Sequence, residues 1–343
     1  MPEQAMICPQ CNAPLSPHRF AKSAKCPYCG TTVHYQDDEK TPLSANVFHK
    51  SYNRWNDPAS QGFDNVISIG KSHWSLKEKI SHGDTCDVYM GMRARWPTEM
   101  AVIKILRDEQ YKNLFDNEWQ RIQALQDSKA PGSDFFSRLL PQPIIHGKVT
   151  GSNQNGQEVS VFRWESGFKY SLADILKANP HGVPVRASIW LWRRILEMLN
   201  FIHTSELVHG AVLPQHILIQ ENEHGARLVS YTCTGPIGET LRMTAKNHSE
   251  CYPKWFKKGS HLSQQADLVM SARCMLTALG GNASKGSLPK EVPETLAKVI
   301  LRVAKAKENE HVTPNAWVLR DELGQVADNV YGDSVFIPIE MPD

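Results

Sequence analysis

The sequence predicts an α+β protein in which a small cysteine-bound module precedes a two-lobed domain, β-rich in its first half and α-rich in its second. Three observations lead to this prediction. Four cysteines form two close pairs in the first thirty residues. Strand patterns fill about residues 74–164, and helical patterns dominate after Tyr170. A chain of 343 residues has room for one large and one small domain.

The bulk composition narrows the class of protein. Apolar residues make up 41% and charged residues 22%, which is ordinary for a soluble globular protein. A net charge of +2 gives no strong field to attract nucleic acid or anionic lipid. We find no apolar run near the ~20 residues that span a bilayer, and no secretion signal at the N-terminus. We therefore expect a cytoplasmic protein without a membrane span, whose thiols stay reduced.

The paired cysteines Cys8, Cys11, Cys26 and Cys29 follow the pattern C-x2-C, fourteen residues, C-x2-C. A two-residue gap lets two thiolates turn back onto one ion, and two such turns complete a tetrahedral four-sulfur site that suits zinc. We predict a structural zinc ribbon over residues 1–36, with an iron centre or redox thiols as alternatives. A closed site of this kind leaves no position for a substrate.

Local residues support this module. Asn12 and Gly30, each following a pair, tolerate the left-handed backbone of a metal-binding turn. Metal binding would supply folding free energy that about thirty residues cannot obtain from a core. The stretch 18–25 is basic, but residues 1–40 carry four basic and four acidic residues. Nucleic-acid binding is therefore the alternative to a protein-docking or structural ribbon.

The remaining chain divides into a linker and a long domain. Residues 37–73 read as a linker, in which Phe48, Tyr52 and Trp55 recur at helical spacing and predict a short helix. The predicted strands are 76–80, 88–92, 100–106, 144–149 and 159–164. The predicted helices are 111–126, 185–204 and 263–279, the last with Ser263 as a cap.

The order of these segments resembles the protein kinase fold over about residues 74–328, which leaves 329–343 as a C-terminal tail. Lys104, in Ala-Val-Ile-Lys, resembles the strand lysine that contacts ATP, and Glu118 resembles its helix partner. The most specific stretch, ILEMLNFIHTSELVHGAVLPQHILI, resembles the end of a long helix, the catalytic loop and the next strand. Asp267 resembles the aspartate that holds the catalytic loop backbone.

The same resemblance shows what is missing. The catalytic loop has Ala211 in place of the base aspartate, Leu213 in place of the lysine and His216 in place of the metal-binding asparagine. Ser230 replaces the aspartate of Asp-Phe-Gly, and no acidic residue lies between Glu223 and Glu239. Without the base and both magnesium ligands, the resemblance implies a pseudokinase with no catalytic residues.

The nucleotide site is also degraded. Of the glycine-rich loop only Gly83 remains, and Asp84 and Asp87 would repel phosphates. Lys104, Glu118 and Gly83 are the candidate nucleotide-contacting residues, but ATP binding is doubtful. A structural ion pair between Lys104 and Glu118 is the favoured reading.

The end of the segment that resembles the activation segment departs from the family as well. Kinases pair a glutamate there with a distant arginine, whereas this chain has Tyr252-Pro253-Lys254-Trp255, and its late loop 310–313 has no arginine. Both ends of that ion pair are therefore predicted to be absent.

Three functions remain open. The first is a regulatory or scaffolding protein in signalling whose partner is a protein such as an active kinase or phosphatase. The second is an atypical ATP-dependent phosphotransferase or nucleotidyltransferase. The third is a nucleic-acid-binding regulator that acts through the ribbon.

Overall fold

The structure is a computed structural model that describes residues 6–8, 14–15, 23–27, 29–34, 62–220, 225–308, 310, 313 and 315–342. The chain forms two compact units, Met1–Asn56 and Asp57–Asp343. Cys11, the basic residues 18–22 and the helix predicted around Phe48 to Trp55 lie outside the described residues.

Two short hairpins build the N-terminal unit. Strand β1 (Met6–Ile7) pairs with β2 (Pro14–Leu15), and β3 (Ser23–Lys25) pairs with β4 (Thr32–His34), both antiparallel. Cys8, Leu15 and Cys26 form its small buried cluster. Gly30 has a φ of +75°, which confirms the left-handed turn predicted there.

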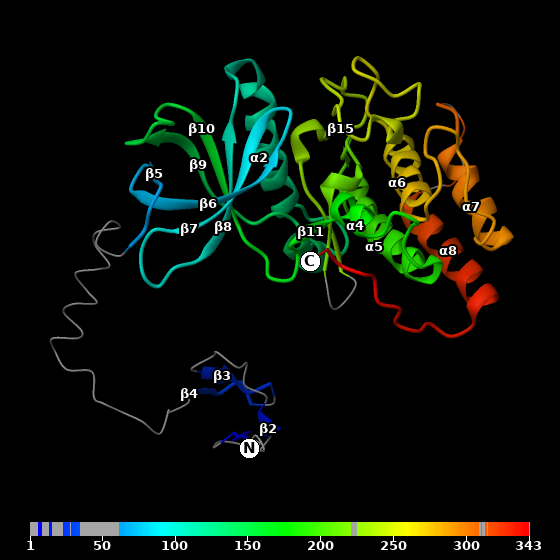
Figure 1. Ribbon diagram of the computed structural model, residues 1–343, viewed down its shortest axis with the longest axis horizontal. Helices are drawn as coiled ribbons and strands as arrows, with labels where there is room; N and C mark the ends of the chain where they lie inside the picture. Colours follow the sequence, from blue (N-terminus) through cyan, green and yellow to red (C-terminus); the bar gives the residue numbers. More distant parts are fainter. Residues whose placement is uncertain are drawn as a thin grey trace. The chain divides into compact units, whose positions relative to one another are not determined.

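The β-rich lobe of the large unit is a closed antiparallel barrel with strand order β10-β8-β7-β6-β5-β9 (Figure 1). Helix α2 (Lys112–Gln126) follows the 3-10 turn η1 (Glu109–Tyr111) and connects β8 to the later strands. The strands are β5 (Val66–Ile69), β6 (Ser72–His82), β7 (Cys86–Arg93), β8 (Met100–Leu106), β9 (Pro143–Thr150) and β10 (Glu158–Arg163). The strand predicted at 100–106 is confirmed at both ends.

One domain boundary was predicted too late. Strand β5 and the start of β6 lie inside the predicted linker 37–73, so the domain begins before residue 74. Ile67 and Ile69 are buried in the barrel core beside Trp74. Val66–Ile69 has three apolar residues and one polar residue, so it shows no clean alternation that would indicate a strand.

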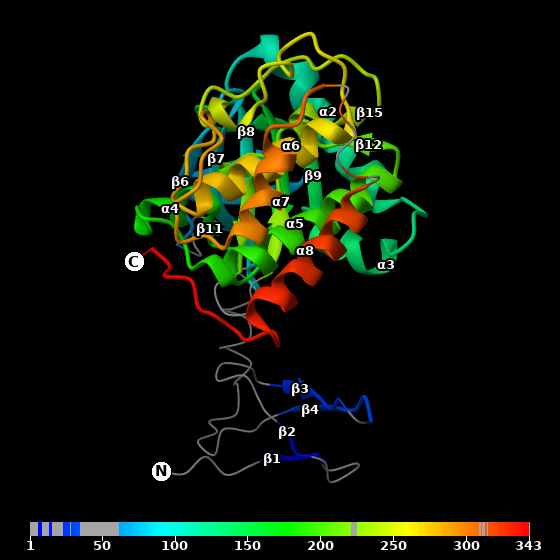
Figure 2. The same ribbon diagram turned by 90° about the vertical axis from the view of Figure 1, so that its right-hand side faces the viewer.

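The helical lobe follows β10 (Figures 1 and 2). The predicted helix 185–204 matches α5 at both ends, and Ser263 caps α6 by accepting a hydrogen bond from the amide of Ala266 at 3.2 Å, as predicted. Its helices are α4 (Leu172–Ala178), α5 (Val185–Thr204), α6 (Gln264–Ala278), α7 (Glu294–Ala304) and α8 (Ala316–Tyr331). Its strands are β11 (Tyr170–Ser171), β12 (Leu207–Val208), β13 (Ile217–Ile219), β14 (Ala226–Leu228) and β15 (Gly235–Pro236). Short turns of helix are α3 (Ser133–Phe136), η2 (Ser137–Leu139), η3 (Pro214–His216), η4 (Tyr231–Cys233) and η5 (Ser249–Cys251).

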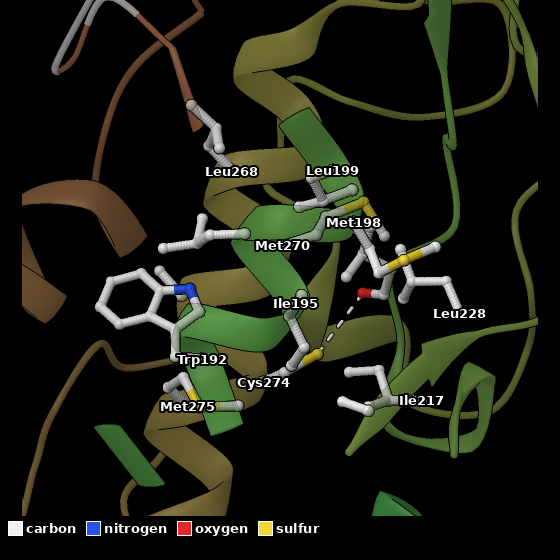
Figure 3. Packing of buried hydrophobic residues seen from close by; sticks show 14 of the residues in the cluster. Trp192, Ile195, Met198, Leu199, Ile217, Leu228, Leu268, Met270, Cys274 and Met275 are labelled. Atoms are coloured by element: carbon white, nitrogen blue, oxygen red, sulfur yellow. Dashed lines mark hydrogen bonds between the residues drawn. The ribbon is translucent and has the colours of Figure 1, made fainter. Parts of the chain in front are cut away.

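The core of this lobe lies between α5 and α6. Figure 3 shows side chains of the two helices meeting face to face, with Ile217 and Leu228 closing one side. The indole of Trp192 donates to the hydroxyl of Ser271 at 3.0 Å, so the largest buried side chain here has its polar atom satisfied. The loop between β12 and β13 packs against this core.

The C-terminal boundary of the domain was predicted too early. Helix α8 continues past residue 328 to Tyr331, and part of the predicted tail 329–343 packs on the lobe. Ile339 is buried, and Ile337 and Met341 are partly buried against the core. Figures 1 and 2 show the chain returning from α8 towards β11 and α4. Among the described residues, no helix is both long and apolar enough to cross a membrane.

Candidate functional site

Lys104 of β8 and Glu118 of α2 form the predicted ion pair, with the ammonium 2.7 and 2.8 Å from the two carboxylate oxygens. Both side chains are largely buried, at 13% and 3% exposed. Burial by itself would lower the pKa of Lys104, but the adjacent Glu118 carboxylate outweighs it, and the net result is a raised pKa. The lysine therefore stays charged inside the protein.

Glu118 also joins this pair to the chain after β14. One carboxylate oxygen accepts the backbone amide of Tyr231 at 2.9 Å in addition to Lys104. Asn117, the residue before Glu118 on α2, adds further contacts: its side-chain amide donates to the carbonyls of Thr232 and Thr234 at 3.1 and 2.9 Å. The pair thus connects a strand, a helix and the segment that resembles the activation segment, which is a structural role.

The loop between β12 and β13 is held by Asp267, as the resemblance implies. Its carboxylate accepts the backbone amides of His209 and Gly210, each at 2.8 Å, and lies 3.0 Å from Nε2 of His203. Asp267 is fully buried. A buried carboxylate with three partners is well satisfied, so Asp267 holds the backbone of this loop.

Apolar or neutral side chains fill the positions where kinases carry catalytic groups. Ala211 is 2% exposed and Leu213 is fully buried in the lobe core. His216 donates from Nδ1 to the carbonyl of Ala211 at 2.8 Å. Burial lowers the pKa of His216 to about 3, so its imidazole is neutral near pH 7. Ser230, at φ +66°, turns the chain without supplying a carboxylate.

Tyr231, the residue after Ser230, packs inside the protein. Its ring meets that of His209 edge-on, with centroids 4.9 Å apart, and burial raises the pKa of its hydroxyl. The hydroxyl of Thr234 donates to the carbonyl of His209 at 3.1 Å. The segment after β14 is therefore fixed to both α2 and the loop that resembles the catalytic loop.

In the turn between β6 and β7, which resembles the glycine-rich loop, both backbone polar groups of Gly83 are hydrogen-bonded. The amide of Gly83 donates to the carbonyl of Cys86 at 2.9 Å, and the carbonyl of Gly83 accepts from Arg107 at 2.7 Å. An amide that donates inside its own turn is not free to donate to a phosphate oxygen. Gly83, a candidate nucleotide contact, is therefore committed within this loop.

The two acidic residues of this turn behave differently from each other. Asp87 was predicted to repel phosphates, yet it lies 2.7 Å from Lys79 and 2.6 Å from His82. Partial burial would raise the pKa of Asp87, but these two partners lower it. The negative charge of Asp87 is thus offset by Lys79 and His82. Asp84 instead contacts a backbone amide in the second half of the domain.

Residues 246–247 run between the β6–β7 turn and the helical lobe. The carboxylate of Asp84 accepts the backbone amide of Lys246 at 3.0 Å. The side-chain amide of Gln215, on η3, donates to the carbonyl of Asn247 at 3.2 Å. We call residues 243–248 the strap. It connects the edge of the barrel to the loop that would carry the catalytic groups.

Sequence reasoning missed Arg273, whose role no local pattern signals. It lies on α6 and donates to the carbonyl of Tyr252 at 2.8 Å, with a longer contact of 3.3 Å to Glu250. Its Nε also donates to the carbonyl of Ala304 at 3.0 Å. An arginine therefore does anchor this segment, through carbonyls rather than a glutamate. Of the late loop 310–313, residues 311 and 312 lie outside the described residues.

The N-terminal unit brings three of the four predicted metal ligands together. The sulfur atoms of Cys8, Cys26 and Cys29 lie within 4.8 Å of one another, and those of Cys8 and Cys29 are 3.6 Å apart. Zn–S bonds of about 2.3 Å in a tetrahedron place sulfurs about 3.8 Å apart, so the described cysteines fit zinc. Cys11 lies outside the described residues.

Comparisons with known proteins bear on the fold alone. No family model matches the chain, and no curated protein matches it in sequence. Vaccinia related kinase 3 is similar in structure, with a TM-score of 0.56, 17% identity and coverage of 81% of this chain and 94% of that one. The BubR1 kinase domain has a TM-score of 0.54, 15% identity and coverage of 78% and 84%. The large unit therefore has a kinase-like fold.

Proposed function

We propose that this protein is a pseudokinase, a catalytically impaired kinase-like protein that acts as a regulatory or scaffolding binding protein in signalling. One observation carries the proposal. At the positions of the base, the lysine and both metal ligands stand Ala211, Leu213, His216 and Ser230, none of which is acidic. Three of them are packed or hydrogen-bonded within the domain itself.

The chemistry of phosphoryl transfer explains why these changes matter. The reaction depends on positioning the nucleotide and neutralising its charge with magnesium, which prefers oxygen ligands. A neutral imidazole and a serine are poor substitutes for an asparagine and an aspartate. Ala211 cannot accept a proton from a substrate hydroxyl. The strap contact and the bonded Gly83 amide further support the proposal that this region does not serve catalysis.

A phosphate-transfer assay tests the proposal. The full chain is incubated with magnesium and γ-labelled ATP, alone and with a general protein substrate. We expect no incorporation above that of Lys104→Met, a variant whose folding is checked by its melting temperature. Autophosphorylation by the natural chain that disappears in a folded Lys104→Met variant would show that the protein is an active kinase.

The second candidate is an atypical phosphotransferase or nucleotidyltransferase, favoured by the intact and charged Lys104–Glu118 pair. Weak nucleotide binding would suffice for it. A thermal-shift titration with ATP, without metal and with magnesium or manganese, separates the two. A saturable rise in melting temperature supports this candidate, and an unchanged melting temperature under all conditions excludes it.

We also propose that the N-terminal unit is a structural zinc ribbon. Cys8, Cys11, Cys26 and Cys29 would hold the ion, and zinc would contribute folding free energy without chemistry. The balance of four basic and four acidic residues over 1–40 supports protein contact over nucleic-acid binding. The third function class, a nucleic-acid-binding regulator, has no observation in its favour among the described residues.

A further inference from the structure

The chain between β15 and α6 is basic. Residues 239–261 hold five basic and two acidic residues. Figures 1 and 2 show this segment as loops at one end of the helical lobe. Both acidic residues have local partners, Glu239 in Arg242 and Glu250 in a nearby histidine. The lysines of this segment therefore determine its net charge.

Three of these lysines stand on two consecutive tight turns, 253–256 and 257–260, which we call the double turn. Each turn closes with a backbone hydrogen bond of 2.8 Å between its first and last residues. Lys254, Lys257 and Lys258 are exposed. Within the described part of the chain none of them has an ion-pair partner, whereas lysines on the barrel and on α7 do. Three positive charges thus lie close together without compensation.

The double turn is anchored by the aromatic residues between its lysines. The indole of Trp255 donates to the carbonyl of Ala306 at 3.1 Å, and Phe256 is 1% exposed. The amide of Gly259 donates to the carbonyl of Leu241 at 2.9 Å. The lysines therefore project from a fixed backbone, which lowers the entropy cost of holding a partner.

The neighbouring segments do not cancel this charge. Residues 305–310, which Trp255 contacts, carry two basic and two acidic residues. Arg242 follows the residue that pairs with the double turn, and it shares the carboxylate of Glu239 with Arg121. The double turn and Arg242 thus form a surface of net positive charge.

An exposed apolar side chain borders this surface. Ile237 is 53% exposed. The next residue, Gly238, donates its amide to the carbonyl of Leu262 at 2.8 Å, and its carbonyl lies 2.9 Å from Nδ1 of His261. These bonds hold Ile237 beside the end of the basic segment. A partner can therefore place an apolar group on Ile237 and negative charges on the lysines.

The surface fits an acidic protein segment better than nucleic acid. Proteins that bind single-stranded nucleic acid use aromatic rings on which the bases stack. Here Tyr252 and Phe256 are buried, and the indole of Trp255 is bonded within the lobe. Proteins that bind duplex DNA commonly contact about 6–10 phosphates. Three lysines and one arginine are too few for that mode.

We propose that this surface binds an acidic segment of a partner protein. Several aspartate or glutamate residues of the partner face Lys254, Lys257 and Lys258, and an apolar residue packs on Ile237. Charge complementarity carries the inference. It rests on the proposed function in one respect, that the chain acts through protein contacts. It requires neither nucleotide nor zinc.

The test selects peptides from a displayed library of random linear sequences on the immobilised full chain. An enriched peptide is then synthesised, and its binding is measured by fluorescence polarisation. We expect enriched sequences to be rich in aspartate and glutamate and to include a large apolar residue. The triple variant Lys254→Glu/Lys257→Glu/Lys258→Glu should weaken binding about tenfold or more, because three attractive charges become repulsive. The same peptide with lysine at its acidic positions should bind the triple variant better than the natural chain.

The matched control is Lys71→Glu/Lys129→Glu/Lys290→Glu, which changes the net charge equally at three exposed positions outside this surface. Its affinity should equal that of the natural chain. Melting temperatures check that both triple variants fold. If the first does not, Lys257→Gln/Lys258→Gln takes its place and should weaken binding about threefold or more.

Two further probes separate a protein partner from other anionic ligands: a short single-stranded DNA and vesicles that contain phosphatidylserine. Tighter binding of either probe than of the enriched peptide, lost in the triple variant, would overturn the proposal. No enrichment, enriched peptides without acidic residues, or equal weakening in both triple variants would do the same. None of these outcomes changes the phosphate-transfer result, so failure here is distinguishable from failure of the proposed function.

Discussion

Asp267 shows how one buried residue can hold the backbone of a loop. Its buried carboxylate accepts two backbone amides and contacts His203. These contacts depend only on the backbone of His209 and Gly210, so they do not require an aspartate at position 211. Asp267 can therefore hold this loop whatever side chain stands at position 211.

Asp267→Ala should destabilise the domain strongly. It leaves two buried amides and a histidine nitrogen without their acceptor, at about 1–3 kcal/mol for each unsatisfied group. We expect the free energy of unfolding to fall by about 3 kcal/mol or more in denaturant titrations. Asp328→Ala, an exposed change on α8, should stay close to the natural value. A loss below about 1 kcal/mol for Asp267→Ala would contradict the role assigned to this carboxylate.

His216 gives a pH-dependent contribution to stability. Its folded-state pKa of about 3 lies below the ordinary value of 6.5, so the unfolded state binds the proton more readily between these two values. Stability from this residue is present above pH 6.5 and is lost as the pH falls towards 3. Between pH 7 and pH 5 the loss is about 2 kcal/mol.

His216→Gln should remove that part of the pH dependence, because glutamine does not titrate and can still donate to the Ala211 carbonyl. Denaturant titrations at pH 7 and pH 5 measure the change. His181→Gln, at an exposed histidine, should leave the dependence intact. If the natural chain and His216→Gln lose the same stability over this range, the imidazole is not held neutral in the fold.

At the scale of elements, the strap joins two parts of the domain through backbone groups. Asp84 contacts it from the β6–β7 turn and Gln215 from η3. A hydrogen bond to a charged acceptor contributes about 1.5–3 kcal/mol. The strap should therefore open less often than an exposed loop of the same length.

Asp84→Ala should raise the hydrogen-exchange rate of the Lys246 amide roughly tenfold, since about 1.4 kcal/mol of local stability corresponds to a factor of ten. Exchange is measured by mass spectrometry on peptides that cover the strap. Asp87→Ala serves as the control, because Asp87 contacts Lys79 and His82 rather than the strap. Equal exchange rates in Asp84→Ala and the natural chain would mean that this contact does not form in solution.

Across the whole molecule, the sequence predicted what depends on periodicity or on a fixed spacing. Helix α5 and strand β8 were predicted at their observed bounds because twenty and seven residues carry a strong pattern. The Lys104–Glu118 pair followed from a resemblance, and the structure confirms its geometry. The position of Asp267 was predicted in the same way.

What could not be predicted depends on contacts between distant segments. Strand β5 is short, and only burial of Ile67 and Ile69 against the barrel identifies it. Arg273 reaches carbonyls more than twenty residues away, which no local pattern records. The commitment of the Gly83 amide is visible only once the turn is folded. A sequence can therefore show which residue types stand at given positions, but not how the polar groups around them are satisfied.

The last prediction concerns the two compact units and the metal. Each has its own buried cluster, a small one around Cys8 and Cys26 and large ones in the kinase-like domain. Purified full chain should contain about one zinc ion, and Cys26→Ser should lose it because one of four thiolates is removed. Since zinc binding and folding of a small metal domain are coupled, amides at 23–34 should then exchange freely.

The main melting transition, which reports the large core, should shift by no more than a degree or two. Cys86→Ser, at a cysteine of the β-rich lobe outside the metal cluster, is the control and should retain its zinc. Full zinc content in Cys26→Ser, or loss of the main transition on zinc removal by a chelator, would contradict a separate four-cysteine ribbon.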